Sequence, residues 1–231
     1  MNAPLTSEQL EALRHVDGAI LANAIESFQK RLRNEGFADG SVRCLIPPLP
    51  PIIGYAVTVK IRGSAPPFAG ETYLDRTDWW DYVVSTPEPR LVVVQDVATR
   101  PGIAALLGAV HINILRALGC VGAATNGAVR DVRAAEDLGF QLFAGGVAVS
   151  HAYVHIVEFG VPVEIGGLKI QPGELLHGDR HGVQSIPGDI AAQIPPVAAK
   201  LAAEEQALIE LCQSPGFTIE KLRAALQAKH P

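Results

Sequence analysis

The sequence predicts an α/β protein, because strand-like apolar runs and helical patterns alternate through the middle of the chain. Residues 90–97, RLVVVQDV, form a continuous apolar run followed by an acid, as expected for a buried strand. Further strands are predicted at 121–125 and 140–146, and helical patterns at 100–120 and 132–139 separate the three strands. This order from residue 90 to 145 is typical of parallel βαβ units.

The flanking segments predict further elements around this core. Thr6 and Gln9 have the spacing of a capping box before the first helix, and Pro195 and Pro196 interrupt the helical pattern near the end of the chain. No internal repeat or linker is visible, so we expect a single domain over residues 1–231. The remaining predicted elements are helical patterns at 7–32 (interrupted at Gly18), 76–85, 198–214 and 218–230, a strand at 52–62, and hairpins within 161–187.

Composition excludes several classes of protein. The chain has 231 residues, 48% of them hydrophobic and 19% charged, which argues against disorder. Its net charge is −5 and no run of Lys or Arg is present, so a nucleic-acid partner is disfavoured. We see no signal peptide and no membrane span, and three isolated cysteines fit a reduced cytoplasmic protein without a cysteine zinc site. Common nucleotide-binding, serine-hydrolase and zinc-protease motifs are missing.

The stretch NGAVRDV, residues 126–132, is the best candidate for a functional site. It follows a predicted strand of small residues, and Gly127 would permit a turn into the next helix. Asp131 could simply cap that helix, with Arg130 a surface charge, or the pair could hold an anionic substrate and a metal ion. Spacing alone leaves these two interpretations level. Asp96 favours the second, because it ends the preceding parallel strand and should emerge at the same edge of the sheet.

Two histidine groups are weaker candidates. His151 and His155 have the i, i+4 spacing of a helical metal pair, but no acidic residue lies between them. His177, Asp179 and His181 alternate as ligands on one strand face could, yet the flanking glycines favour a solvated turn. For both groups the sequence favours a role without metal.

The motif GAVRDV, followed by AAEDLGFQLFAGGVAVS and VPVEIGGLKIQPGELLHGDRHGVQSIP, resembles the RraA-like family, which includes the 4-hydroxy-4-methyl-2-oxoglutarate aldolases. The order of these segments matches across most of the chain. The resemblance implies a three-layer β/β/α domain of the swivelling type that assembles as trimers or hexamers. It also implies a Mg²⁺- or Mn²⁺-dependent lyase that cleaves a 4-hydroxy-2-oxo acid into pyruvate and a second oxo acid, with oxaloacetate decarboxylation as a companion activity.

The same resemblance implies roles for individual residues. Asp131 would be the direct metal ligand, Arg130 would bind the oxo acid and offset charge on the enolate, and Asp96 would hold a metal-bound water. The turn Gly108, Ala109 and Val110 would bind the substrate carboxylate through backbone amides. An acid on a C-terminal helix would reach a neighbouring subunit's site; Glu205 fits best, with Glu204 the alternative, and a solvated helix face is an equal reading for both.

Two departures and a competing function follow from the same comparison. The family usually has Asp at the position of Asn126 and Glu at the position of Ala109. Some relatives are regulators that bind and inhibit ribonuclease E without catalysis, and this is the alternative function. A third possibility is the same enolate chemistry on a different substrate, shaped by the segment that contains Trp79 and Trp80.

Overall fold

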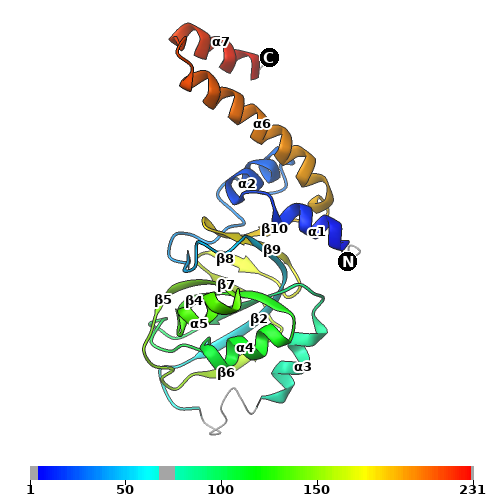
Figure 1. The fold of residues 1–231 in the computed structure, drawn as a ribbon. Helices are drawn as coiled ribbons and strands as arrows, with labels where there is room; N and C mark the ends of the chain where they lie inside the picture. The colour runs from blue at the N-terminus through cyan, green and yellow to red at the C-terminus, as the bar shows by residue number, and fades with distance from the viewer. Residues whose placement is uncertain (1–4, 68–75, 230–231) are drawn as a thin grey trace.

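A computed structural model describes residues 5–67 and 76–229 of the chain. Figure 1 shows a central sheet with helices around it and a long C-terminal helix that projects away from the sheet. The helices are α1 (Ser7–Arg14), α2 (Gly18–Ser27), α3 (Thr77–Ser85), α4 (Ala109–Ala117), α5 (Val132–Leu138), α6 (Ile194–Gln213) and α7 (Ile219–Lys229). The strands are β1 (Arg43–Cys44), β2 (Ile52–Arg62), β3 (Arg90–Asp96), β4 (Cys120–Val129), β5 (Gln141–Val147), β6 (His155–Phe159), β7 (Val163–Ile165), β8 (Leu168–Ile170), β9 (Leu175–Asp179) and β10 (Gly182–Ile186).

The main sheet is mixed, with a parallel core. Its strand order is β1-β5-β4-β3-β2-β9-β10, and β2, β3, β4 and β5 run parallel to one another. On the side of β2 away from β3, two strands pair with it in antiparallel fashion. The first residues of β2 pair with β9, and its last residues pair with β6. The predicted βαβ core is therefore confirmed, and the carboxyl ends of β3 and β4 lie at the same edge of the sheet.

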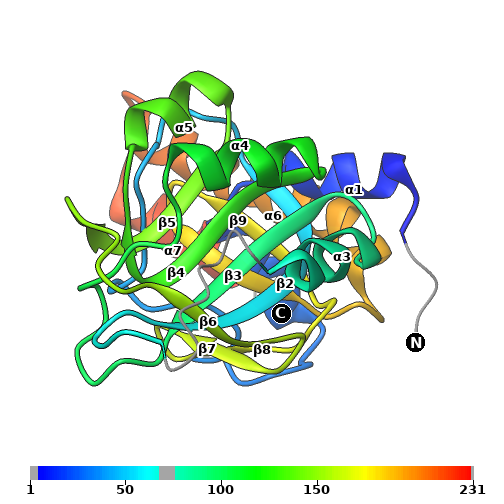
Figure 2. The ribbon, with the colours of Figure 1, turned by 90° about the horizontal axis from the view of Figure 1, so that it is seen from below.

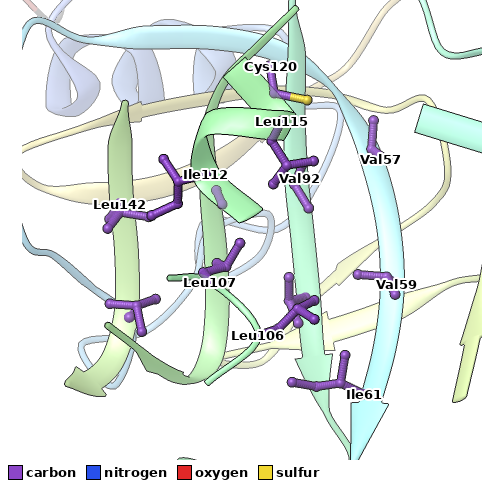
Figure 3. Close-up of a cluster of buried hydrophobic side chains, with 14 of the residues drawn as sticks. Val57, Val59, Ile61, Val92, Leu106, Leu107, Ile112, Leu115, Cys120 and Leu142 are labelled. Carbon is purple, nitrogen blue, oxygen red and sulfur yellow. The ribbon is translucent and has the colours of Figure 1, made fainter. Parts of the chain in front are cut away.

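Three layers build the domain, as the β/β/α expectation required. Alternate residues of β2 (Val57, Val59 and Ile61) face a core shared with α3, α4 and α5, and Figure 3 shows this cluster between the sheet and α4. Residues of the opposite parity, such as Ala56, face a second core covered by the β7–β8 hairpin. Figure 2 shows helices above the sheet and the hairpin below it.

A third apolar cluster joins α1, α2 and α6 to β9 and β10. Only Ile194 and Ala198 of α6 are buried, so most of this 20-residue helix lies outside the core. The expected interruption of the first helical pattern is present, but it lies just before Gly18, which is the first residue of α2. The predicted capping box of Thr6 and Gln9 is also present. Within the described ranges, no helix is both long and apolar enough to cross a membrane.

Three predicted boundaries were wrong for identifiable reasons. The helix expected from residue 100 begins only at Ala109, because the segment before it is held as a loop by the side chain of Asp96. Asn126 and Gly127, expected in a turn, lie inside β4 at an irregularity of its pairing with β5. Pro195 and Pro196 lie in the first turn of α6, where the missing N–H groups have no helical partner to lose.

Candidate functional site

Asp131 occupies the position before α5 but does not cap that helix with its side chain. The residue adopts a left-handed conformation with φ of 53°, which costs a residue with a Cβ about 1 kcal/mol. Its Oδ2 instead accepts a hydrogen bond of 2.8 Å from the backbone N–H of Ala109, the first residue of α4. The side chain is exposed. The capping interpretation of Asp131 is therefore wrong, because its carboxylate is directed across to the amino terminus of another helix.

The amino terminus of α4 lies directly beside this carboxylate. Gly108 is the N-cap residue, and a Cβ added there would stand 3.1 Å from Oδ2 of Asp131 and 3.9 Å from the Cβ of Arg130. The backbone N–H groups of Gly108 and Val110 make no hydrogen bond with any residue of 5–67 or 76–229. Exposed amides at a helix start attract anions, and Val110 is 63% exposed. The predicted turn is thus in place beside Asp131.

Arg130 is the positive group of the site. Its backbone N–H donates to the carbonyl of Leu107 at 2.8 Å, which ties the end of β4 to the loop before α4. The side chain is half-buried, and its guanidinium forms no ion pair or hydrogen bond with the part of the chain that the structure describes. A guanidinium in this situation can bind an incoming carboxylate through two parallel hydrogen bonds.

Asp96 lies at the end of β3 and is only 2% exposed. Its Oδ1 accepts from the N–H of Ala98 at 3.0 Å, and its Oδ2 accepts from the N–H of Gly102 at 2.9 Å. The carboxylate therefore organises the loop between β3 and α4. Sequence reasoning placed Asp96 at the correct sheet edge but did not anticipate these two backbone partners.

Asn126 links β4 to β3 through its side-chain amide. Its Oδ1 accepts from the backbone N–H of Asp96 at 2.8 Å, and its Nδ2 donates to the backbone carbonyl of Asp96 at 3.1 Å. This pair of bonds joins β4 to β3 just beyond the last residues in register, Val94 and Thr125. Gly127 permits the approach, since a Cβ there would stand 3.1 Å from the Cβ of Asp96. Asn126, where the family usually has Asp, thus uses both the donor and the acceptor of its side-chain amide.

His111 was missed as a functional candidate, because a single His in an apolar helix carries no motif. It is fully buried on α4. Its Nδ1 lies 3.1 Å from the carbonyl oxygen of Leu106, and its Nε2 lies 3.3 Å from Nε1 of Trp79. A carbonyl can only accept and an indole N–H can only donate, so the ring is neutral with its proton on Nδ1. Burial lowers the pKa of His111 to about 4, which keeps it neutral at physiological pH.

The two weaker histidine groups do not form the arrangements that would bind metal on one helix or strand. His151 lies in an irregular segment and His155 begins β6, so they do not share a helical face. The expected solvated turn is wrong for His177 and Asp179, which are buried on β9, and holds only for His181.

A different acidic group exists where β9 meets the amino terminus of α2. Ligand atoms of Asp17, Asp179 and His181 lie within 4.8 Å of one another. Both acids already bind backbone N–H groups at this helix start: Asp17 that of Ala19, and Asp179 that of Gly18. These bonds explain the group as helix capping. Burial opposes ionisation of Asp179, but the N–H groups of His181 and Gly18 outweigh it and hold its pKa below the usual range.

Glu205 lies on α6, the helix that projects away from the sheet, whereas Asp131 precedes α5 on the sheet (Figure 1). Its Oε1 accepts a hydrogen bond of 3.1 Å from Nδ2 of Asn23 on α2. Glu204, the alternative, lies 3.9 Å from Nζ of Lys200 on the same helix. Within one chain, neither acid joins the group formed by Arg130 and Asp131.

Comparison with known proteins agrees with this architecture. A family model described as RraA-like, Aldolase/RraA, matches residues 19–184. A protein of Halalkalibacterium halodurans, described as a proposed 4-hydroxy-4-methyl-2-oxoglutarate aldolase, is 33% identical over 104 residues, or 45% of this chain. The match spans about half the length of that relative (50%).

Solved structures share the fold at low identity. One is an uncharacterized protein from Pseudomonas syringae pv. tomato, with a TM-score of 0.75, 23% identity, and coverage of 97% of this chain and 96% of that chain. Another is RraAS2 of Streptomyces coelicolor, described as an unusual member of the RNase ES inhibitor RraA protein family. It has a TM-score of 0.70, 21% identity, and coverage of 88% of this chain and 97% of that chain. With a family model over most of its length and this shared fold, the chain belongs to the RraA-like family.

Proposed function

We propose that this chain is a divalent-metal-dependent carbon–carbon lyase that releases pyruvate from 4-hydroxy-2-oxo acids such as 4-hydroxy-4-methyl-2-oxoglutarate, and decarboxylates oxaloacetate. The observation that carries the proposal is that two residues lie beside the amino terminus of α4: Asp131, which is exposed and whose carboxylate accepts from Ala109, and the half-buried Arg130, whose Cβ lies next to Gly108. The name of the Halalkalibacterium halodurans relative supports the same reaction class.

The residues present fit Mg²⁺ or Mn²⁺. Oδ2 of Asp131 accepts from Ala109, while Oδ1 accepts no hydrogen bond from the residues described in the structure, so one hard oxygen ligand faces outward. Mg²⁺ is commonly held by one or two carboxylates and several waters, so a sparse ligand set is suitable. When bound there, the metal would polarise the 2-oxo group of the substrate as a Lewis acid.

The chain's own groups account for the rest of the proposed reaction. The N–H groups of Gly108 and Val110 bind the substrate's C1 carboxylate at the start of α4, where the helix dipole favours negative charge. Arg130 donates to the oxygen on which charge develops as the carbon–carbon bond breaks, and so stabilises the enolate of pyruvate. As the C3–C4 bond breaks, a water oriented by Asp96 takes the proton of the 4-hydroxyl, which becomes the carbonyl of the second oxo acid, and the same water returns a proton to C3 of the enolate to give pyruvate. In oxaloacetate the bond to the C4 carboxylate breaks instead, CO₂ leaves, and the water supplies the proton to C3.

Asp96 has a supporting role in this proposal. Each of its oxygens accepts one backbone N–H and retains capacity for a second hydrogen bond. Asp96 therefore holds the loop beside the site in place and can orient a water. We also propose that the chain assembles as a trimer or hexamer in which Glu205 of one subunit completes the site of the next.

A coupled assay of pyruvate release from oxaloacetate and from 4-hydroxy-4-methyl-2-oxoglutarate tests the proposal. Arg130→Gln and Asp131→Asn should each lower kcat/KM by about 10²-fold to 10³-fold, the usual loss when a charge-stabilising group is removed. The Asn variant still tolerates a positive φ and can still accept from Ala109, so it removes the charge alone.

Matched controls lie on α5. Arg133 and Asp137 form an exposed ion pair of 2.9 Å, so Arg133→Gln and Asp137→Asn should keep wild-type turnover. Full activity of Arg130→Gln or Asp131→Asn would refute the site. If the wild type turns over neither substrate with Mg²⁺ or Mn²⁺ but binds ribonuclease E tightly, the regulator is the correct function.

A further inference from the structure

A four-residue segment, Leu106 to Ala109, connects the two candidate site residues to α4. The carbonyl of Leu107 accepts from the backbone N–H of Arg130 at 2.8 Å, and the N–H of Ala109 donates to Oδ2 of Asp131 at 2.8 Å. The position of Arg130 and Asp131 therefore depends on the conformation of this segment. The first helical hydrogen bond of α4 is accepted by the carbonyl of Gly108, from the N–H of Ile112 at 2.9 Å, so Leu106 and Leu107 lie outside the helical hydrogen bonding.

His111 binds the start of this segment from within α4. Its Nδ1–H donates to the carbonyl of Leu106 at 3.1 Å, so the side chain folds back over the helix amino terminus. Leu106 and Leu107 are each 1% exposed and belong to the main core (Figure 3). If the hydrogen bond from His111 is lost, water therefore has little access to the carbonyl of Leu106 to replace it.

Two indoles of α3 hold the imidazole on its other side. Nε1 of Trp79 donates to Nε2 of His111, and the ring of Trp80 meets the imidazole edge-on with centroids 5.1 Å apart. Trp79 is fully buried, so it acts as core packing and as the donor that orients His111. Both ring nitrogens thus have partners that select one tautomer and one ring orientation.

We propose that His111 is a positioning residue: through the carbonyl of Leu106 it holds residues 106–109 so that the first amides of α4 face the substrate beside Arg130 and Asp131. The kinetic consequence of this inference rests on the proposed function, whereas its structural consequence does not.

Two amide variants separate the contacts of the ring. His111→Asn places a donor near the position of Nδ1 and can keep the bond to Leu106, but it loses the acceptor for Trp79. His111→Gln reaches the position of Nε2, keeps the acceptor for Trp79 and loses the bond to Leu106. His177→Gln is the matched control, because His177 is also buried (1% exposed) but lies on β9, away from α4.

The first readout is hydrogen exchange of the Ala109 amide, which needs neither metal nor turnover. His111→Gln should speed this exchange by about tenfold, the size of one lost buried hydrogen bond, while His111→Asn and His177→Gln leave it near the wild-type rate. The second readout is turnover of oxaloacetate with Mg²⁺. His111→Gln should raise KM by about tenfold with little change in kcat, because the turn amides bind the carboxylate in ground and transition states alike.

Each outcome decides between the two ideas. The positioning role is overturned if His111→Asn and His111→Gln behave alike, or if exchange of the Ala109 amide is unchanged in His111→Gln. The denaturant midpoints of the wild type and both variants are measured alongside, and equal midpoints do not rescue the positioning role. If exchange changes as expected but the wild type turns over neither oxo acid, the positioning role stands and the proposed function fails.

Discussion

Replacement of Asn126 by Asp tests the paired amide that joins β4 to β3. Asp has an oxygen where Asn has its NH₂ group, so the ionised carboxylate can accept hydrogen bonds but cannot donate one. It would keep the bond of 2.8 Å from the N–H of Asp96 and lose the bond of 3.1 Å to the carbonyl of the same residue. Two acceptor oxygens would then face each other across that distance.

The magnitude follows from burial. A carbonyl left without its donor in a poorly solvated place costs about 1–3 kcal/mol. The introduced charge would also lie close to the carboxylate of Asp96, which is 2% exposed, so repulsion adds to the loss. We therefore expect Asn126→Asp to lower the free energy of unfolding by about 3 kcal/mol at pH 8, at the upper end of that range.

Urea denaturation at pH 8 and at pH 5 measures this effect. Protonation of the new carboxyl restores a donor, so the folded state binds the proton more tightly than the unfolded state, and the deficit should shrink as the pH falls. Asn113→Asp is the control: Nδ2 of Asn113 also donates to a carbonyl, that of Ala109 at 2.8 Å, but the side chain is exposed, so little stability should be lost. Equal losses for the two variants, or a deficit independent of pH, would refute the reasoning.

Two further predictions address titration and assembly. The pKa of His111 lies at about 4 in the folded protein against 6.5 for an unperturbed His, so the unfolded state takes up the proton first as the pH falls. Stability from His111 is complete above pH 6.5 and is lost toward pH 4, by about 2 kcal/mol between pH 6.5 and pH 5. Urea titrations should show a smaller pH dependence in His111→Gln than in the wild type; identical slopes would contradict the assignment. For assembly, the Arg130→Gln and Glu205→Gln proteins should each be inactive alone. When the two are unfolded and refolded together, partial activity should return, because some sites in the mixed oligomers contain both an intact Arg130 and an intact Glu205. Pyruvate release measures this, and activity of Glu205→Gln alone would show that Glu205 is not needed.

The sequence by itself determined the order of the elements and the approximate position of the core strands. Alternation in β2 and the apolar run in β3 are local patterns, because a side chain's face depends only on its position within the strand. Arg130 and Asp131 were correctly predicted to lie between β4 and α5, although β4 extends four residues beyond its predicted end. The shared edge of β3 and β4 followed from parallel pairing, which a helical connection between consecutive strands normally imposes.

The tertiary structure decided what those side chains contact. Asp131 has the local sequence of a helix cap, but Ala109, 22 residues earlier, donates to its carboxylate. Asn126 has the local sequence of a turn, but its amide matches the backbone of Asp96, 30 residues away. Glu205 has the local sequence of a solvated helix face, but its carboxylate accepts from Asn23 on α2, 182 residues earlier.

The same physical reason separates the two kinds of result. Helix and strand patterns reflect interactions between residues a few positions apart, and these are written along the chain. A carboxylate, an amide or an imidazole can satisfy its hydrogen bonds with any suitable backbone group that the fold brings within about 3 Å. For Asp131, Asn126 and His111 the sequence supplied the chemical groups. The fold selected their partners: the start of α4 for Asp131 and His111, and the neighbouring strand β3 for Asn126.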